Sequence, residues 1–159
     1  MTLYVVTDWM GLIPIGVCFF FAIWGLIQLI KRKSILKVDK DILLLGAFYI
    51  AVISFYSLFE FLVINYRPVL INGNLEASYP SSTTMLSICV FISAIMALFN
   101  RVKGAGNKGI IIATFSLLTA FMVIARIISG VHWISDIIGG VLISCALIFT
   151  YGFALKMLK

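Results

Sequence analysis

The sole histidine of the chain lies four residues before a carboxylate, in a segment that reads Ala125-Arg126-Ile127-Ile128-Ser129-Gly130-Val131-His132-Trp133-Ile134-Ser135-Asp136. If residues 132–136 open a helix, Asp136 can accept the Nδ1 proton of His132, fix its tautomer and leave Nε2 as a nucleophile or base. The alternative is that His132 and Trp133 are ordinary interfacial residues and Asp136 is a first-turn helix acid. His-x-x-x-Asp alone does not separate these interpretations.

Two arginines, Arg67 and Arg126, each lie at the end of an apolar run beside other polar residues. After Arg67 comes a segment that reads Ser78-Tyr79-Pro80-Ser81-Ser82-Thr83-Thr84 and leads into the next apolar run. A helix N-terminus with hydroxyls and free amides favours an anion, and guanidinium groups add planar, bidentate contacts to phosphate. The alternatives are that Ser and Thr only cap the helix, and that each arginine reaches a lipid phosphate.

Composition identifies the environment in which these residues must work. Hydrophobic residues make up 63% of the 159 residues, charged residues 11%, and the mean hydropathy is +1.17. An ordinary soluble domain has only about 45–50% apolar residues, so a water-soluble core is excluded. Cys18, Cys89 and Cys145 lie in apolar stretches without C-x-x-C spacing and are interpreted as small buried hydrophobes. No cleavable signal peptide is expected at the start.

The apolar residues fall in stretches of about 20, the length that crosses a hydrocarbon core of about 30 Å. We expect five spans, at Gly11 to Ile30, Ile42 to Ile64, Thr83 to Phe99, Ile110 to Ser129, and Asp136 to Leu158. The spans should be helices, because a backbone in lipid must satisfy its own hydrogen bonds and a β-barrel would show short alternating segments. The sequence therefore predicts an all-α, polytopic membrane bundle that forms a single domain over residues 1–159.

The distribution of basic residues predicts how the bundle is oriented. Ten of the twelve Lys and Arg residues share one end of the predicted spans: Lys31, Arg32, Lys33, Lys37, Lys40, Arg101, Lys103, Lys108, Lys156 and Lys159. By the positive-inside rule that end is cytoplasmic, together with the C-terminus, and the N-terminus is outside. Such a rim can also attract anionic lipid headgroups. The other two basic residues, Arg67 and Arg126, are then at the outer face.

Taken together, these segments resemble the type 2 phosphatidic acid phosphatase, or lipid phosphate phosphatase, family. Its three motifs are Lys, six residues, Arg-Pro; then Pro-Ser-Gly-His; then Ser-Arg, five residues, His, three residues, Asp. Arg126, His132 and Asp136 match the third motif, with Ala125 in place of its Ser. Arg67-Pro68 match the end of the first motif and Pro80-Ser81 the start of the second.

The resemblance implies a membrane phosphohydrolase that acts on a lipid-linked phosphate through a phosphohistidine at His132, without a metal or cofactor. It assigns Asp136 to orient His132, and Arg67 and Arg126 to stabilise the pentavalent phosphate. The residues expected to contact the substrate are Ser81, Ser82, Thr83, Tyr66 and Glu60. The expected partners are the lipid substrate and the surrounding lipid, and the site should face outside in a multi-pass protein of the plasma membrane.

The chain departs from the family at three further positions: Glu60 replaces the Lys, Ser82 the Gly and Thr83 the second His. That His is the family's general acid, and a threonine hydroxyl does not titrate near neutrality. The departure favours a leaving group that needs no proton, such as the phosphate released from a polyprenyl diphosphate. We expect Glu60 to pair with a basic residue, and Arg67 is one candidate across two helical turns. The alternatives are that Glu60 stays protonated or that it helps to hold a divalent ion.

Two other classes of function stay open. A catalytically impaired member of the family would bind lipid phosphate for transport, sensing or regulation, and a structural membrane subunit would match the motifs by coincidence. Nucleic-acid binding is not expected, because the net charge of +6 comes from the flanks of the spans. Family cores usually have one more N-terminal span, and a homodimer is one way to cover the exposed flank. Gly139-Gly140 is expected to let helices approach closely, with a dimer contact as the alternative.

Overall fold

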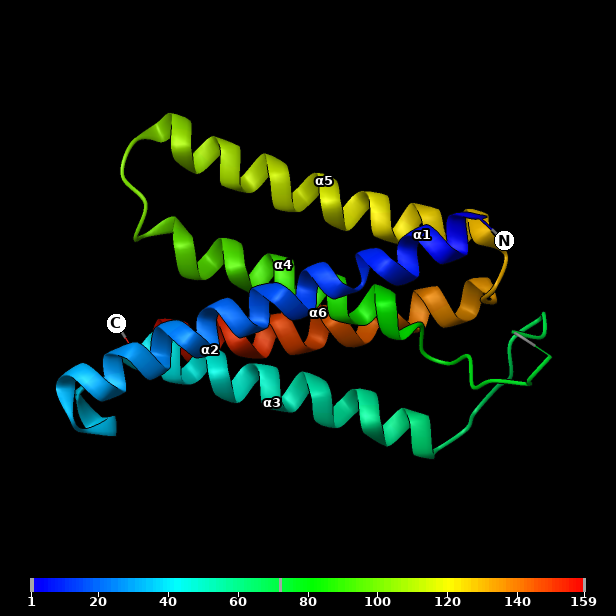
Figure 1. Cartoon of the computed structure of the whole chain (residues 1–159), viewed down its shortest axis with the longest axis horizontal. Helices are drawn as coiled ribbons and strands as arrows, with labels where there is room; N and C mark the ends of the chain where they lie inside the picture. Colours follow the sequence, from blue (N-terminus) through cyan, green and yellow to red (C-terminus); the bar gives the residue numbers. More distant parts are fainter. Residues whose placement is uncertain (1, 72, 159) are drawn as a thin grey trace.

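The computed structural model describes residues 2–71 and 73–158, and its long elements are all α-helices (Figure 1). The helices are α1 Thr2–Met10, α2 Leu12–Arg32, α3 Lys40–Phe61, α4 Ser82–Phe99, α5 Ala105–Ser129 and α6 Ile134–Met157, with a short 3₁₀ helix at Ile35–Lys37. The predicted all-α bundle is confirmed. Lys159, one member of the predicted basic rim, lies outside the described residues.

Five stretches of the described chain are long and apolar enough to cross a membrane, which confirms the predicted number of spans. Large apolar side chains such as Leu117, Leu142 and Phe153 face outward on them and are more than half exposed. A soluble protein would bury such side chains, whereas a lipid-facing surface presents them. The protein is therefore an integral, multi-pass membrane protein; which end faces the cytoplasm stays a prediction.

The first span begins earlier than predicted, because α1 precedes it and the apolar stretch runs from Tyr4 to Arg32. The N–H of Gly11, between α1 and α2, still donates to the carbonyls of Thr7 and Asp8 at 3.0 Å. Pro14 lies in the first turn of α2, where the loss of an N–H donor costs least. The α1 helix packs beside the C-terminal end of α5 (Figure 1).

Two other predicted ends also differ from the structure. The α3 helix ends at Phe61 and not at Ile64, because the apolar residues 62–64 enter a loop that pairs with itself. The α5 helix begins at Ala105 and not at Ile110, directly after Gly104, whose φ of +86° makes the turn out of α4. Both differences have the same reason. Hydropathy marks where the apolar residues begin and end, whereas the ends of a helix are set by its backbone hydrogen bonds.

The α4 helix lies in the centre of the bundle and contacts α2, α3, α5 and α6. Met85, Cys89 and Val90 on it are completely buried. At its C-terminal end, Arg101 donates to Asp41 at the start of α3 (2.7 Å), and its guanidinium lies over the Trp24 ring of α2 at 5.3 Å. The contacts of Arg101 hold the C-terminal end of α4, and the buried residues hold its middle. Because the helix is rigid, these contacts also fix the position of its N-terminus.

Two glycines of α6 allow the close approach that was predicted for them. A Cβ atom on Gly139 would lie 2.4 Å from the Tyr79 ring, and one on Gly140 would lie 3.1 Å from the carbonyl oxygen of Ser81. Both neighbours belong to the segment that leads into α4 of the same chain. The packing therefore favours the internal role over a dimer contact, and it holds that segment against the start of α6.

Gly139→Ala is expected to destabilise the protein by about 1–3 kcal/mol, because the added methyl group would overlap the Tyr79 ring, which must shift to make room. Thermal unfolding of the purified protein in one detergent measures the effect. Gly46→Ala is the matched control, since a Cβ atom there meets nothing within 4 Å and alanine is favoured over glycine in a helix. Equal unfolding temperatures for the two variants would contradict the packing argument.

Candidate active site

The loop between α3 and α4 is a short hairpin that brings polar residues to the end of the bundle. Isolated antiparallel bridges join Tyr66 to Ala77 and Ile71 to Asn74. The N–H of Arg67 donates to the carbonyl of Glu76 at 3.1 Å, so these two residues face each other across the hairpin. The turn includes Gly73 with a φ of +81°, a conformation that glycine adopts without strain. The Asn-Gly pair at 72–73 is a sequence signal for such a turn.

His132 lies between α5 and α6, in a segment that begins where Gly130 ends α5 with a φ of +66°. The predicted helix over residues 132–136 is wrong by two residues, because α6 begins at Ile134. The Nδ1 atom of His132 lies 3.8 Å from Oδ2 of Asp136, which is an ion-pair distance and too long for a hydrogen bond. The expected direct bond between the two side chains is therefore absent from this structure.

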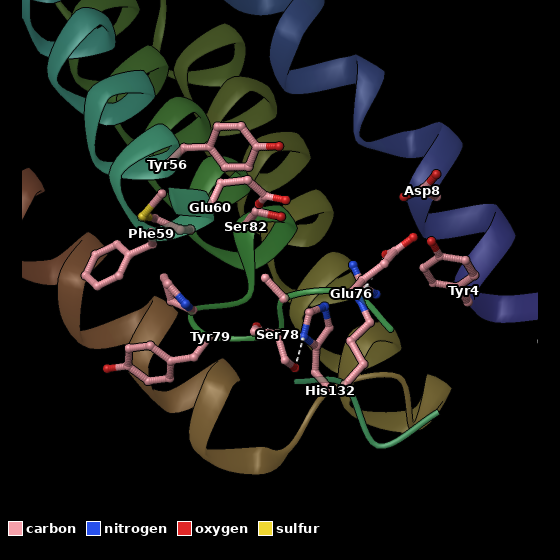
Figure 2. Close-up of a pocket in the computed structure, with 14 residues that line it drawn as sticks. Tyr4, Asp8, Tyr56, Phe59, Glu60, Glu76, Ser78, Tyr79, Ser82 and His132 are labelled. Atoms are coloured by element: carbon pink, nitrogen blue, oxygen red, sulfur yellow. Dashed lines mark hydrogen bonds and ion pairs between the residues drawn. The ribbon is translucent and has the colours of Figure 1, made fainter. Parts of the chain in front are cut away.

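Ser78 lies beside His132 (Figure 2) and contacts both His132 and Asp136. The Nδ1 atom of His132 lies 3.1 Å from the carbonyl oxygen of Ser78 and 3.2 Å from its Oγ. The same hydroxyl donates to Oδ2 of Asp136. Asp136 also accepts the backbone N–H of Trp133 at 2.9 Å, so it acts as a helix-start acceptor as well. Asp136 is therefore a first-turn helix acid and is also linked to His132 through Ser78, so the two interpretations of this residue are compatible.

Arg126, near the end of α5, is almost completely buried, with 1% of its side chain exposed. Its Nη2 donates to the hydroxyl of Thr83 at 2.6 Å and to Asp8 at 3.3 Å. Its Nε and Nη1 have no hydrogen-bond partner among the described residues. Arg67 is 12% exposed, and its Nε lies 3.2 Å from Oε2 of Glu76.

The expected pairing of Arg67 with Glu60 is wrong, because the helix that would align them ends at Phe61 and Glu76 takes the contact instead. The ring of Tyr4 on α1 lies 5.7 Å from the guanidinium carbon of Arg67 and 5.1 Å from that of Arg126. One aromatic ring thus contacts both guanidinium groups, and each arginine also has one carboxylate neighbour.

A polar cavity of about 300 Å³ opens beside these groups. Four of the predicted site residues line it: Glu60, Arg67, Ser82 and His132. Arg126, Asp136 and Thr83 are not among the lining residues: Asp136 contacts Ser78, Arg126 contacts Asp8, and Thr83 contacts Arg126. Ser81 is buried, with its hydroxyl unpartnered among the described residues, and its N–H donates to the carbonyl of Asp136 at 3.0 Å.

Tyr66 lies outside the cavity lining and is about half exposed, while its carbonyl accepts the ring N–H of Trp133 at 2.9 Å. Within residues 2–71 and 73–158, no cluster of three His, Cys, Asp or Glu side chains is arranged to hold a metal ion. Among the lining residues that sequence reasoning did not include in the site are Tyr4, Asp8, Glu76 and Ser78. The Asn-Gly signal alone does not identify Glu76, because a two-residue turn there would pair residue 69 with residue 76, whereas the structure pairs Tyr66 with Ala77 and Arg67 with Glu76.

The electrostatics of the site favour a neutral His132. Burial and the positive charges of Arg67 and Arg126 lower its pKa from 6.5 to about 4. Asp136 and the bond to the Ser78 carbonyl oppose that shift. Because the Ser78 carbonyl can only accept, Nδ1 carries the proton and Nε2 keeps its lone pair. A neutral imidazole beside two buried guanidinium groups can attack an electrophilic centre that carries negative oxygens.

Two comparisons with known proteins found a match, one to a family and one to a fold. The model of the PAP2 superfamily matches residues 42–156. Among solved structures, the chain is similar to the "Crystal structure of the first transmembrane PAP2 type phosphatidylglycerolphosphate phosphatase from Bacillus subtilis", with 19% identity and a TM-score of 0.67 over 95% of this chain and 79% of that chain. At that identity the likeness shows the fold alone. A search of curated proteins found no match.

The state of His132 can be measured directly, because it is the only histidine of the chain. We expect ¹⁵N-histidine NMR of a preparation without a histidine tag to show the Nδ1-protonated tautomer at neutral pH and titration near pH 4. An unfolded chain protonates its histidine near pH 6.5, so stability should fall as the pH is lowered from 6.5 to about 4. An Nε2-protonated ring, or titration above pH 6.5, would contradict the geometry.

Proposed function

The chain belongs to the PAP2 superfamily, and on that premise we propose that it is a membrane phosphatase that releases phosphate from a lipid-linked phosphate. The observation that carries the proposal is a neutral histidine at a cavity that Arg67 lines, with Arg126 in contact with the lining residue Asp8. The buried Nε and Nη1 of Arg126 carry three N–H donors without a hydrogen-bond partner in the described chain, and a buried donor is costly unless an acceptor reaches it. A phosphate group satisfies both the charge and the planar donors.

In the proposed reaction, Nε2 of His132 attacks phosphorus, a bond between nitrogen and phosphorus forms, and the bond to the leaving oxygen breaks. Arg67, Arg126 and the first amides of α4 neutralise the equatorial oxygens as the pentavalent state develops. Asp136 and Ser78 hold the protonated Nδ1 side of the ring. Water then attacks phosphorus, the bond to nitrogen breaks, and inorganic phosphate leaves with Nε2 restored.

Thr83 bears on the choice of substrate. It stands where the family has its general acid, and its hydroxyl accepts from Arg126 rather than facing a leaving group. An alcohol leaving group must gain a proton, whereas a phosphate leaving group ionises near neutrality and leaves without one. We therefore propose a lipid diphosphate, such as a polyprenyl diphosphate, as the preferred substrate, cleaved to the monophosphate at the non-cytoplasmic face.

Phosphate release from a panel of lipid monophosphates and diphosphates tests this function in detergent. We expect turnover of the diphosphates at least about tenfold faster, since a missing general acid costs about 10²–10⁴ in rate when a proton is needed. His132→Ala should abolish release, and Tyr66→Phe, outside the cavity lining, should keep it. Comparable His132-dependent rates on both substrate classes would refute the diphosphate preference.

A second function is favoured by the same Thr83 and by Glu60 at the position of the family's Lys. In that case the protein binds lipid phosphate without turnover, for transport, sensing or regulation. Wild-type protein that binds the lipids of the panel and releases no phosphate would establish the second function in place of the first.

The carboxylates of Asp8 and Glu76 take contacts on the two arginines that phosphate oxygens would otherwise take. Both are more exposed than the arginines they contact, so they are free to withdraw. We expect Asp8→Asn and Glu76→Gln each to tighten orthovanadate binding by about fivefold, roughly the 1 kcal/mol of a partly exposed ion pair.

Isothermal titration of orthovanadate into the purified protein measures this competition. Glu60→Gln is the matched control, because Glu60 lines the same cavity and Arg67 is paired with Glu76 instead. It removes the same charge without releasing an arginine, so its effect should stay below about twofold. Equal effects of all three substitutions would mean that only the general field had changed.

A further inference from the structure

We infer that Ser78 is the positioning residue of His132 and that its hydroxyl couples the charge of Asp136 to the imidazole ring. The inference rests on the proposed function for its kinetic consequence and on the contacts for its structural part. Ser78 lies in the hairpin loop, far in sequence from His132 and Asp136, and contacts both of them. It is 2% exposed.

The donors and acceptors leave one arrangement of protons in this cluster. The Oδ2 atom of Asp136 accepts from the hydroxyl of Ser78, so the hydroxyl hydrogen points to the carboxyl group. The Oγ lone pairs are then available to the Nδ1–H of His132 at 3.2 Å, together with the Ser78 carbonyl oxygen at 3.1 Å. The resulting order is ring N–H to hydroxyl to carboxylate, and in a neutral imidazole it leaves Nε2 unprotonated.

The backbone explains why a bridging hydroxyl is needed. Asp136 is held at the start of α6 by the N–H of Trp133, while His132 lies before that helix, and the two side chains stay 3.8 Å apart. Ser78 is fixed from its own side, because its N–H donates to the carbonyl of Asn65 at 2.9 Å. The neighbouring N–H of Ser81 donates to the carbonyl of Asp136. The hydroxyl is thereby held in the gap.

The chemical consequence arises when Nε2 bonds to phosphorus. The ring then gains positive charge, its Nδ1–H becomes a stronger donor, and the hydroxyl passes part of the charge of Asp136 to it. Asp136 is completely buried and His132 is 7% exposed, so bulk water is not positioned to replace this contact. The benefit exists mainly after the reaction has begun, so loss of the hydroxyl should affect kcat more than KM.

Ser78→Ala tests the inference, with Ser78→Thr as the variant that keeps a hydroxyl. We expect Ser78→Ala to lower kcat by about 10- to 100-fold, the scale of a misplaced reacting group, with KM changed by less than about twofold. Ser78→Thr should recover most of the loss. Ser129→Ala is the matched control, because Ser129 lies near the same end of the bundle and bonds only to the backbone of α5.

A spectroscopic arm separates this inference from the proposed function, because it needs no turnover. In ¹⁵N-histidine spectra, Asp136→Asn should shift the Nδ1 resonance of His132 in the wild-type background and leave it nearly unchanged in the Ser78→Ala background. That result supports the coupling even if the protein releases no phosphate. The same Asp136→Asn shift in both backgrounds, in folded protein, would overturn the inference whatever the kinetics show.

Discussion

The organisation of the site follows from the burial of one guanidinium group. Arg126 is 1% exposed at the end of a lipid-embedded bundle, where an unpaired charge would cost several kcal/mol. Each neighbouring element therefore brings it a partner: α1 brings Asp8 and the ring of Tyr4, and α4 brings the hydroxyl of Thr83. These partners leave Nε and Nη1, with three N–H donors, without a hydrogen-bond partner among the described residues. A phosphate group bound there would supply the missing acceptors.

The central helix makes this arrangement possible. Its C-terminal end is tied to α2 and α3 through Arg101, and its buried middle leaves little freedom to slide. The N-terminus, which carries Thr83, is then placed by the contact of Gly140 with Ser81. The contacts that fix the C-terminal end of α4 therefore also help to fix the position of Thr83 at its N-terminus. The close approach is possible because α6 has no side chain at the two crossing positions.

The membrane spans and the residues of the third motif could be predicted from the sequence, whereas contacts between side chains far apart in the sequence could not. Hydropathy finds the five spans, and the third motif places Arg126, His132 and Asp136 at one end of the bundle. Ser78 can bridge His132 and Asp136 because the two side chains are 3.8 Å apart, which is too far for a direct hydrogen bond. The spacing of residues in the sequence does not encode so small a difference in distance. The α1 helix was missed because its apolar residues merge with the first span.

The exchange of the family's second histidine for Thr83 fits the charge balance of the site. A histidine there could become positively charged beside Arg67 and Arg126, whose charges already lower the pKa of His132. Threonine instead accepts from Arg126 and adds no charge, so in the proposed mechanism His132 stays neutral and the arginine stays oriented. The cost in that mechanism is the proton for the leaving group. A substrate whose leaving group ionises by itself would remove that cost, and so, under the proposed function, the residue that weakens general acid catalysis would also narrow the range of substrates.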